Sequence, residues 1–258
     1  MFIHLKLKST YSLLEGAIFP KDLAKRCLEF GMPAVGISDR GNLFGALEFS
    51  EIIAGHGIQP IIGCQLPINV DSILDSQSTN LSNTSMVFIA KNELGYSNLI
   101  NLSSELHLSE TNKLNGLALD KITDRSDGLI CISGGSEGPI NKLFEDTKEN
   151  LARDLIERIK KIFGDRFYLE LNRHPSQEAR REMASDVEKF ILENADYYNI
   201  PLVATNDVYF LDKSLYEPHD ALLCIAEGNY VDQKMDRRSL SEDHFFKSSE
   251  QMKDLFSD

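Results

Sequence analysis

Short apolar runs recur along the chain, separated by stretches whose apolar residues have helical spacing. The runs are IHLKL near residue 5, AVGIS near 36, PIIGC near 62, MVFIA near 88, LICIS near 131, FYLEL near 169 and PLVAT near 203. Runs of this length that alternate with helices are typical of parallel strands, because parallel strands need long crossover connections. The pattern therefore predicts an α/β fold, a parallel (β/α)7 barrel.

The first helix is predicted directly after the first run. An apolar stripe is formed by Leu23, Ala24, Cys27 and Leu28. Pro20 suits the first turn of a helix, and Gly31 is a residue type at which helices commonly end. The same reasoning predicts helices over residues 46–54, 94–106, 150–163, 177–198 and 218–227.

Two segments lack a regular pattern. Residues 71–85 read DSILDSQSTNLSNTS, a polar composition that predicts a mobile surface loop. Residues 108–116 are predicted to be a second irregular connection, short enough to be ordered.

Lys6 and Lys8 alternate along the first run, so an extended backbone places them on one face. Imidazoles at this spacing could grip a metal ion. A charged lysine offers three donors and no lone pair, so it cannot be a ligand and repels a divalent cation. The alternative is that both lysines point to solvent on an ordinary edge strand.

Composition limits the possible functions. The 258 residues include 42% apolar ones, enough for a full-sized core in one domain. The net charge of −13, from 27 basic and 40 acidic residues, opposes non-specific binding to nucleic acid. Positive clusters at residues 121–125 and 234–238 could still contact a nucleic-acid strand in a larger assembly.

The four cysteines indicate neither a zinc site nor a disulfide framework. Cys27, Cys64, Cys131 and Cys224 lie far apart and form no CxxC pair, so reduced core cysteines are expected.

The chain shows no apolar run of membrane-spanning length and no leader pattern. A cytoplasmic location without membrane contact is therefore expected.

Six strings, in chain order, carry a resemblance to a known family. They are HLKLKSTYSLLEGA, GMPAVGISDRGNLFGALEF, IQPIIGCQLPI, AKNELGYSNLINL, FGDRFYLELNRH and PLVATNDVYFL. Together they resemble the PHP domain at the N-terminus of bacterial DNA polymerase III alpha subunits. The resemblance implies a distorted (β/α)7 barrel of the PHP type and a single domain over residues 1–258, cut from the N-terminus of a much longer polymerase chain.

The resemblance also implies where metal ligands would stand in members that bind metal. The strand-one histidines of the family fall on Lys6 and Lys8, and the aspartate of LLDG falls on Glu15. Of these positions only Glu15 and Asp207 keep a carboxylate, so no metal ion and no catalytic residue is expected in this domain. The remaining ligand positions are Arg40, Gln65, Ser85, Gly135 and Tyr209.

Charged side chains at these positions suggest a replacement for the metal. Lys6, Lys8 and Arg40 bring positive charge, and Glu15, Asp39 and Asp207 bring negative charge, so a salt-bridge network could hold the loops that a metal once held. The alternative is simple drift, with each charge solvated separately. His4 shares a face with Lys6 and Lys8, but one histidine makes no metal site. The other histidines fall outside the motif positions and are interpreted as surface or core residues: His56, His107, His174, His219 and His244.

The function implied by the resemblance is that of a catalytically silent structural and interaction module in DNA replication. Its partners would be the polymerase core of the same chain, the proofreading exonuclease subunit and the replicative holoenzyme, with little direct DNA binding. The parent chain would be a nucleotidyltransferase, a DNA-directed DNA polymerase, with magnesium in its polymerase region.

Two enzymatic alternatives remain at this point. One is a residual metal-dependent phosphoesterase or 3′–5′ exonuclease that uses Glu15, Asp39 and Asp207. The other is a stand-alone phosphatase resembling histidinol phosphatase, against which the strings GYSNLINL and KSSEQMKDLF argue, because they match the polymerase version.

Overall fold

The computed structural model describes the chain except residues 71–80, 82–83, 176–180, 234–236 and 258. The described chain forms two compact units. The first unit comprises Met1–Ile61, Arg173–Ala179 and Thr205–Asp258, and the second comprises Ile62–Asn172 and Arg180–Ala204. Each unit is described by itself below.

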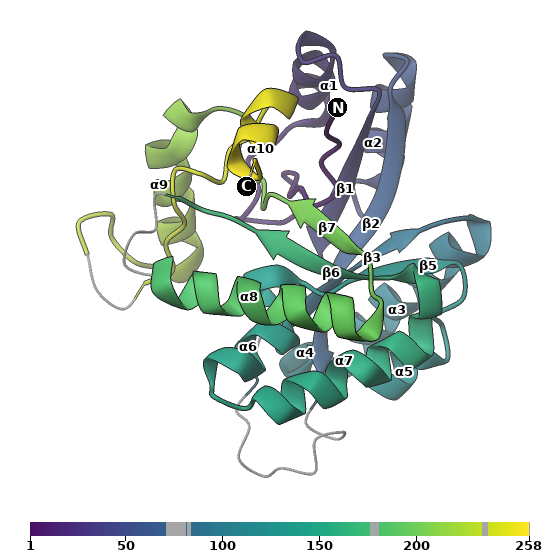
Figure 1. Cartoon of the computed structure of the whole chain (residues 1–258). Coiled ribbons are helices and arrows are strands. Elements are labelled where there is room, and N and C mark those ends of the chain that lie inside the picture. Colours follow the sequence, from purple (N-terminus) through teal and green to yellow (C-terminus); the bar gives the residue numbers. More distant parts are fainter. Residues whose placement is uncertain (71–80, 82–83, 176–180, 234–236, 258) are drawn as a thin grey trace. The chain divides into compact units, whose positions relative to one another are not determined.

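The second unit is built on a mixed sheet (Figure 1). Its strands neighbour one another in the order β2-β3-β5-β6-β7, and β4 pairs with β2. Strand β3 is antiparallel to both β2 and β5, whereas β5 and β6 are parallel. The strands are β2 (Gln59–Asn69), β3 (Ser85–Ala90), β4 (Leu117–Ala118), β5 (Leu129–Ile132), β6 (Phe167–Asn172) and β7 (Leu202–Thr205).

Helices cover this sheet because each has one apolar face. In α7, Leu155, Ile156 and Ile159 are buried. Helices α7 and α8 lie side by side against β5 and β6 (Figure 1), and Arg153 of α7 donates to the side chain of Asn194 of α8 at 2.9 Å. The helices are α3 (Glu93–Leu108), α4 (Glu110–Asn115), α5 (Leu119–Thr123), α6 (Pro139–Glu145), α7 (Glu149–Phe163) and α8 (Arg181–Tyr198), with 3₁₀ turns η1 (Gly135–Glu137) and η2 (Gly164–Arg166).

The first unit contains β1 (Ala34–Arg40), which neighbours β2 in the sheet order, beside the start of that strand. Helix α1 (Pro20–Glu29) begins at Pro20, as predicted, and packs against α2 (Ala46–Gly55). The unit also contains the turn η4 (Lys213–Leu215), α9 (Tyr216–Glu227) and α10 (Ser249–Leu255). Helix α10 begins with a capping box between Ser248 and Gln251.

The structure confirms all six predicted helices, apart from small differences at their ends. Part of the range predicted for α8, residues 177–180, lies outside the described residues. The pattern missed α5, α6 and α10, which are too short to show several helical turns. The prediction of an irregular connection over residues 108–116 is wrong, because Glu110–Asn115 form α4, capped by the Ser109 side chain.

The predicted loop over residues 71–85 lies largely outside the described residues. At its end, Ser85 already belongs to β3. The expectation of a single domain over residues 1–258 stays a prediction.

The expectation that the strands are all parallel is wrong at β3, which is antiparallel to both neighbours. A short apolar run identifies a buried strand but carries no information about its direction.

The first apolar run does not form a regular strand. It makes single bridges, Leu7 with Val208 and Ser9 with Ile18. The run is still bonded on both sides, because Ser38 donates to the Leu7 carbonyl at 2.9 Å and Lys8 donates to the Val208 carbonyl at 2.8 Å. These bonds are too irregular for a ladder, but they fix the positions of both lysines.

Candidate functional site

In the first unit, the run that carries Lys6 and Lys8 is buried. Both lysines are 1% exposed, so the alternative that they point to solvent is wrong. Between them, Leu7 is fully buried in the core. A buried ammonium is costly unless a partner compensates it, so the partners of these lysines define the site.

Lys6 forms an ion pair with Asp207, with 2.9 Å between Nζ and Oδ1. The two side chains are 0% and 6% exposed. Burial is the largest single influence and opposes ionisation of Asp207, but the charge and hydrogen bond of Lys6 together with the nearby His174 and His244 outweigh it and hold the pKa of this carboxyl well below its usual range. By a direct charge contact, the pair therefore joins two positions where the resemblance predicts metal ligands in active members.

Lys8 and Asp39 both contact serine groups of the first unit. The Lys8 ammonium donates to the Ser38 carbonyl and lies 3.3 Å from the Ser38 hydroxyl. The Asp39 carboxylate accepts the Ser9 N–H at 2.8 Å, the Ser9 hydroxyl at 2.7 Å and the Ser12 hydroxyl at 2.6 Å. These donors occupy both oxygens of Asp39, which is 2% exposed.

Glu15 receives two guanidinium groups. Arg40 Nε lies 2.8 Å and Arg238 Nη1 lies 3.2 Å from the same oxygen, Oε2. The Arg238 guanidinium also lies over the Tyr209 ring, 5.9 Å from its centroid. The backbone carbonyl of Glu15 is 2.6 Å from Nε2 of His219. The loop that carries Glu15 is thus tied to three separate segments.

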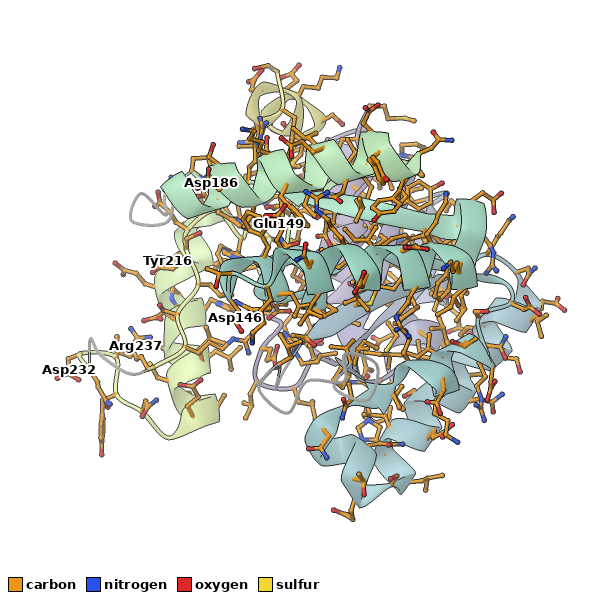
Figure 2. The ribbon with its side chains drawn as sticks, turned by 60° about the horizontal axis from the view of Figure 1, so that its bottom comes forward. Asp146, Glu149, Asp186, Tyr216, Asp232 and Arg237 are labelled. Atoms are coloured by element: carbon orange, nitrogen blue, oxygen red, sulfur yellow. The ribbon has the colours of Figure 1, made fainter. Side chains whose placement is uncertain are left out.

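The arginine next to this cluster has its own partner. Arg237 lies beside α9 (Figure 2), and its guanidinium binds both carboxylate oxygens of Asp220 at 2.6 and 2.8 Å. This bidentate geometry matches the fork of the guanidinium group.

Buried histidines and a lysine complete the first unit's cluster. The rings of His174 and His244 stack with centroids 4.1 Å apart and an interplanar angle of 7°. Burial lowers the pKa of His174 to about 3 and also lowers the pKa of His244. Burial likewise lowers the pKa of His4 to about 4 and that of Lys247 to about 8. All three histidines are therefore neutral at pH 7.

In the second unit, the positions where the resemblance predicts ligands carry residues without a charged side chain, Gln65, Ser85 and Gly135. The Gln65 amide donates to the Ser85 hydroxyl at 2.5 Å and to the Glu137 carboxylate. Gly135 has φ +57°, and a Cβ built there would lie 3.1 Å from the Glu170 carboxyl group. Glu170, 2% exposed, therefore takes the space beside Gly135 that a cysteine side chain would need.

The residues present do not fit a metal centre. Among the described residues, no group of three or more His, Cys, Asp or Glu side chains could hold an ion. The carboxylates at the motif positions of the first unit are already bound by lysine, arginine or serine donors. A zinc or manganese site needs several free N, O or S donors around one point.

Sequence reasoning missed several members of these clusters. Arg238, His174, His244 and Lys247 lie outside the motif strings' ligand positions, and nothing in their local sequence indicates burial or pairing. Ser9 and Ser12 gave a weak signal, because serines spaced closely in a turn often bond to nearby polar groups.

Comparison with known proteins places this geometry in context. The model of the PHP domain family matches residues 4–174. The DNA polymerase III subunit alpha of Caulobacter vibrioides is 42% identical over all of this chain, and that of Campylobacter jejuni is 32% identical. The chain spans 22% of each of these two relatives.

Solved structures support the fold. An amidohydrolase from Chromobacterium violaceum superimposes with a TM-score of 0.51 over 81% of this chain and 88% of its own, at 14% identity. A candidate metal-dependent phosphoesterase from Bifidobacterium adolescentis gives 0.50 over 80% and 86%, at 13% identity. These likenesses confirm the predicted fold class, a distorted α/β barrel. Within the described part of the chain, no helix has the length and apolar character needed to cross a bilayer.

Proposed function

Because the chain belongs to the PHP domain family, we propose that it acts as the catalytically silent PHP region of a replicative DNA polymerase III alpha subunit. In this role it is a structural and interaction module that supports the polymerase core in bacterial DNA replication. The similarity of the whole chain to alpha subunits from several bacteria supports this assignment.

The ion pair between Lys6 and Asp207 is the observation that supports the proposed lack of catalytic activity. Two positions that would bind metal in active relatives instead neutralise each other in the core. The Lys6 ammonium has no lone pair to offer, and its charge repels a divalent cation from the Asp207 carboxylate. We derive no metal-dependent step, since the residues present do not fit the ion.

The ionic and polar contacts of the first unit take over the structural task of the metal. A metal centre ties several loops together, and here Asp39 ties the segment of Ser9 and Ser12 to the end of β1. Glu15 ties its own loop to Arg40 and Arg238. The module therefore keeps a fixed surface without a cofactor.

The proposed partners are the polymerase core of the same chain, the proofreading exonuclease subunit and, through them, the replicative holoenzyme. The net charge of −13 supports protein partners over direct DNA binding by this region. Magnesium would serve the polymerase region of the parent chain, and the location would be cytoplasmic.

Metal content tests the silence of the site. The purified chain would be equilibrated with zinc and manganese, desalted and subjected to elemental analysis. We expect less than about a tenth of an equivalent of bound metal, because the donors are already paired. The triple variant Lys6→His, Lys8→His and Arg40→His serves as the gain-of-binding control. One or more equivalents on the unmodified chain would overturn the proposal.

Binding to the proofreading exonuclease tests the interaction role separately. Isothermal titration of the purified chain with the exonuclease subunit should give a saturable complex that is insensitive to chelators. Absence of binding would contradict exonuclease docking and leave the metal result unaffected.

The second candidate function is a residual metal-dependent phosphoesterase or 3′–5′ exonuclease. The retention of Glu15, Asp39 and Asp207 favours it. The test is hydrolysis of a chromogenic phosphodiester and of a 3′-labelled oligonucleotide with manganese present. Activity that disappears in Asp207→Asn would establish this candidate, whereas activity that persists in the variant would indicate a contaminant.

A further inference from the structure

A hollow of about 530 Å³ lies on the second unit, where α3, α4 and α5 meet. None of its residues is a former metal-ligand position, and none takes part in the clusters described above. Its lining includes Glu105, Leu108, Ser109, Asn112, Lys121 and Arg125.

The hollow is lined by more positive side chains than negative ones. The two oxygens of Glu105 each meet one cation, with Oε1 3.2 Å from Lys121 Nζ and Oε2 3.3 Å from Arg125 Nη2. Two positive side chains therefore share one carboxylate, so the charged side chains lining the hollow sum to one positive charge. The carboxylate is 22% exposed, whereas the lysine and arginine are 47% and 31% exposed. Both cations thus remain accessible to a ligand while Glu105 holds them together.

Hydrogen bonds fix the wall of the hollow. The Asn112 side chain donates to the Glu105 carbonyl at 3.2 Å, which ties α4 to α3. The Ser109 hydroxyl accepts the Asn112 N–H at 3.3 Å and caps α4. Leu108 is 87% exposed beside these polar groups. The cations are thus displayed on a packed helical frame.

We propose that this hollow binds a phosphate-bearing anion through Lys121 and Arg125. A guanidinium group and an ammonium group side by side can each donate to phosphate oxygens, and arginine suits two-pronged recognition. A phosphate dianion is attracted by two cations and repelled by one carboxylate at similar range, so the net Coulomb term is favourable. Glu105 pairs with both cations in the unliganded chain and competes with the anion for them.

The phosphate could come from a free phosphate ester or from the backbone of single-stranded nucleic acid. The large negative charge of the chain opposes long-range steering of either source, so binding must depend on these short contacts. The proposal is independent of the proposed function, because it uses none of the residues of that site.

The test is a titration of the intact chain with inorganic phosphate at constant ionic strength, followed by NMR of the backbone amides and the arginine Nε–H groups. We expect saturable shifts at Arg125 and neighbouring residues. Arg125→Gln and Lys121→Gln should each weaken binding about tenfold, the effect of losing one charge-assisted hydrogen bond. Arg125→Lys, which keeps the charge, should weaken binding less and guards against loss of folding.

Two variants separate binding from a structural ion pair. Glu105→Gln should tighten phosphate binding, because it removes the repelling charge. If Lys121 and Arg125 serve only to form ion pairs with Glu105, the variant should bind phosphate more weakly or not at all. Lys161→Gln is the matched control, since Lys161 pairs one-to-one with Glu157 at 2.6 Å on α7 and should not affect phosphate binding.

An oligothymidylate titration distinguishes the two sources. Binding of the oligonucleotide that is lost in Arg125→Gln would identify a nucleic-acid backbone as the source. Binding of phosphate without binding of the oligonucleotide would identify a small phosphate ester. Two results would overturn the proposal. One is that phosphate does not saturate up to about 10 mM and the oligonucleotide does not bind either. The other is that Arg125→Gln leaves the binding unchanged.

Discussion

Two ion-pair clusters of this protein use the same chemical groups in opposite ways. In the first unit, Lys6 and Asp207 are 0% and 6% exposed, and their charged atoms lie 2.9 Å apart. In the second unit, Glu105 is 22% exposed and is shared by Lys121 and Arg125 at longer distances. The first cluster is closed to a ligand, and the second is open.

The comparison shows that burial, rather than residue type, decides whether a charge cluster can bind a ligand. A buried pair contributes little net stability relative to apolar residues, but either partner alone is very costly. An exposed pair contributes little to folding stability whether or not the pair is formed, so its cations remain available for binding. The predictions below test this contrast.

The largest effect is expected for Asp207→Ala, which leaves the Lys6 ammonium buried without its partner. We expect a loss of about 3–5 kcal/mol in the free energy of unfolding, measured by urea denaturation. The double variant Lys6→Met with Asp207→Leu should recover most of this loss, because it removes both charges. An unchanged melting temperature for Asp207→Ala would show that the pair has no structural role.

Acidification should weaken the first unit through its buried histidines. The pKa of His4 is lowered from 6.5 to about 4, so the unfolded chain binds a proton more readily. The stability that His4 contributes is complete above pH 6.5 and is lost as the pH falls toward 4, by roughly 3 kcal/mol. Urea titrations between pH 4 and 7 measure how the free energy of unfolding depends on pH, and this dependence should be weaker in His4→Gln. His107→Gln, an exposed site on α3, should keep the full dependence.

Gln65→Glu tests the hydrogen bonds that Gln65 makes in the second unit. The new carboxylate would face Glu137, which now accepts a hydrogen bond from the Gln65 amide. The two like charges should raise the pKa of the new carboxyl group, so the variant loses stability as the pH rises. We expect a loss of about 1–3 kcal/mol at pH 8 and a smaller loss at pH 5. Equal losses at both pH values would indicate a steric cause.

Lys121→Gln is expected to have the smallest effect on folding. Its ion pair with Glu105 is exposed, so the free energy of unfolding should change by less than about 1 kcal/mol. Chemical denaturation at low and high salt measures the change. A loss comparable with that of Asp207→Ala would remove the contrast between the two clusters.

The sequence predicted most elements of the fold. Long helices such as α7 have a strong apolar face, and their positions follow directly from that periodicity. It did not predict the antiparallel pairing of β3, because a buried apolar run has no direction. It also placed a regular strand at the first run, where the backbone makes only single bridges.

The sequence likewise located the members of the candidate site better than their partners. Lys6, Asp207, Glu15 and Arg40 were expected in one network, and in the structure Lys6 forms an ion pair with Asp207 while Arg40 forms one with Glu15. Arg238 reaches Glu15 from far along the chain, and no local pattern indicates such a contact. Lys8 contacts the carbonyl and hydroxyl of Ser38, groups whose role depends entirely on the folded backbone.

By itself, the sequence determined the family and the alternation of strands and helices. It also predicted that Lys6 and Lys8 cannot be metal ligands, because residue identity alone decides whether a side chain has a lone pair to donate. The tertiary structure decided which charges are buried and which partner each one meets. The cost of a charge depends on its distance from water and from its counter-charge, and those distances arise only when segments far apart in the chain pack together.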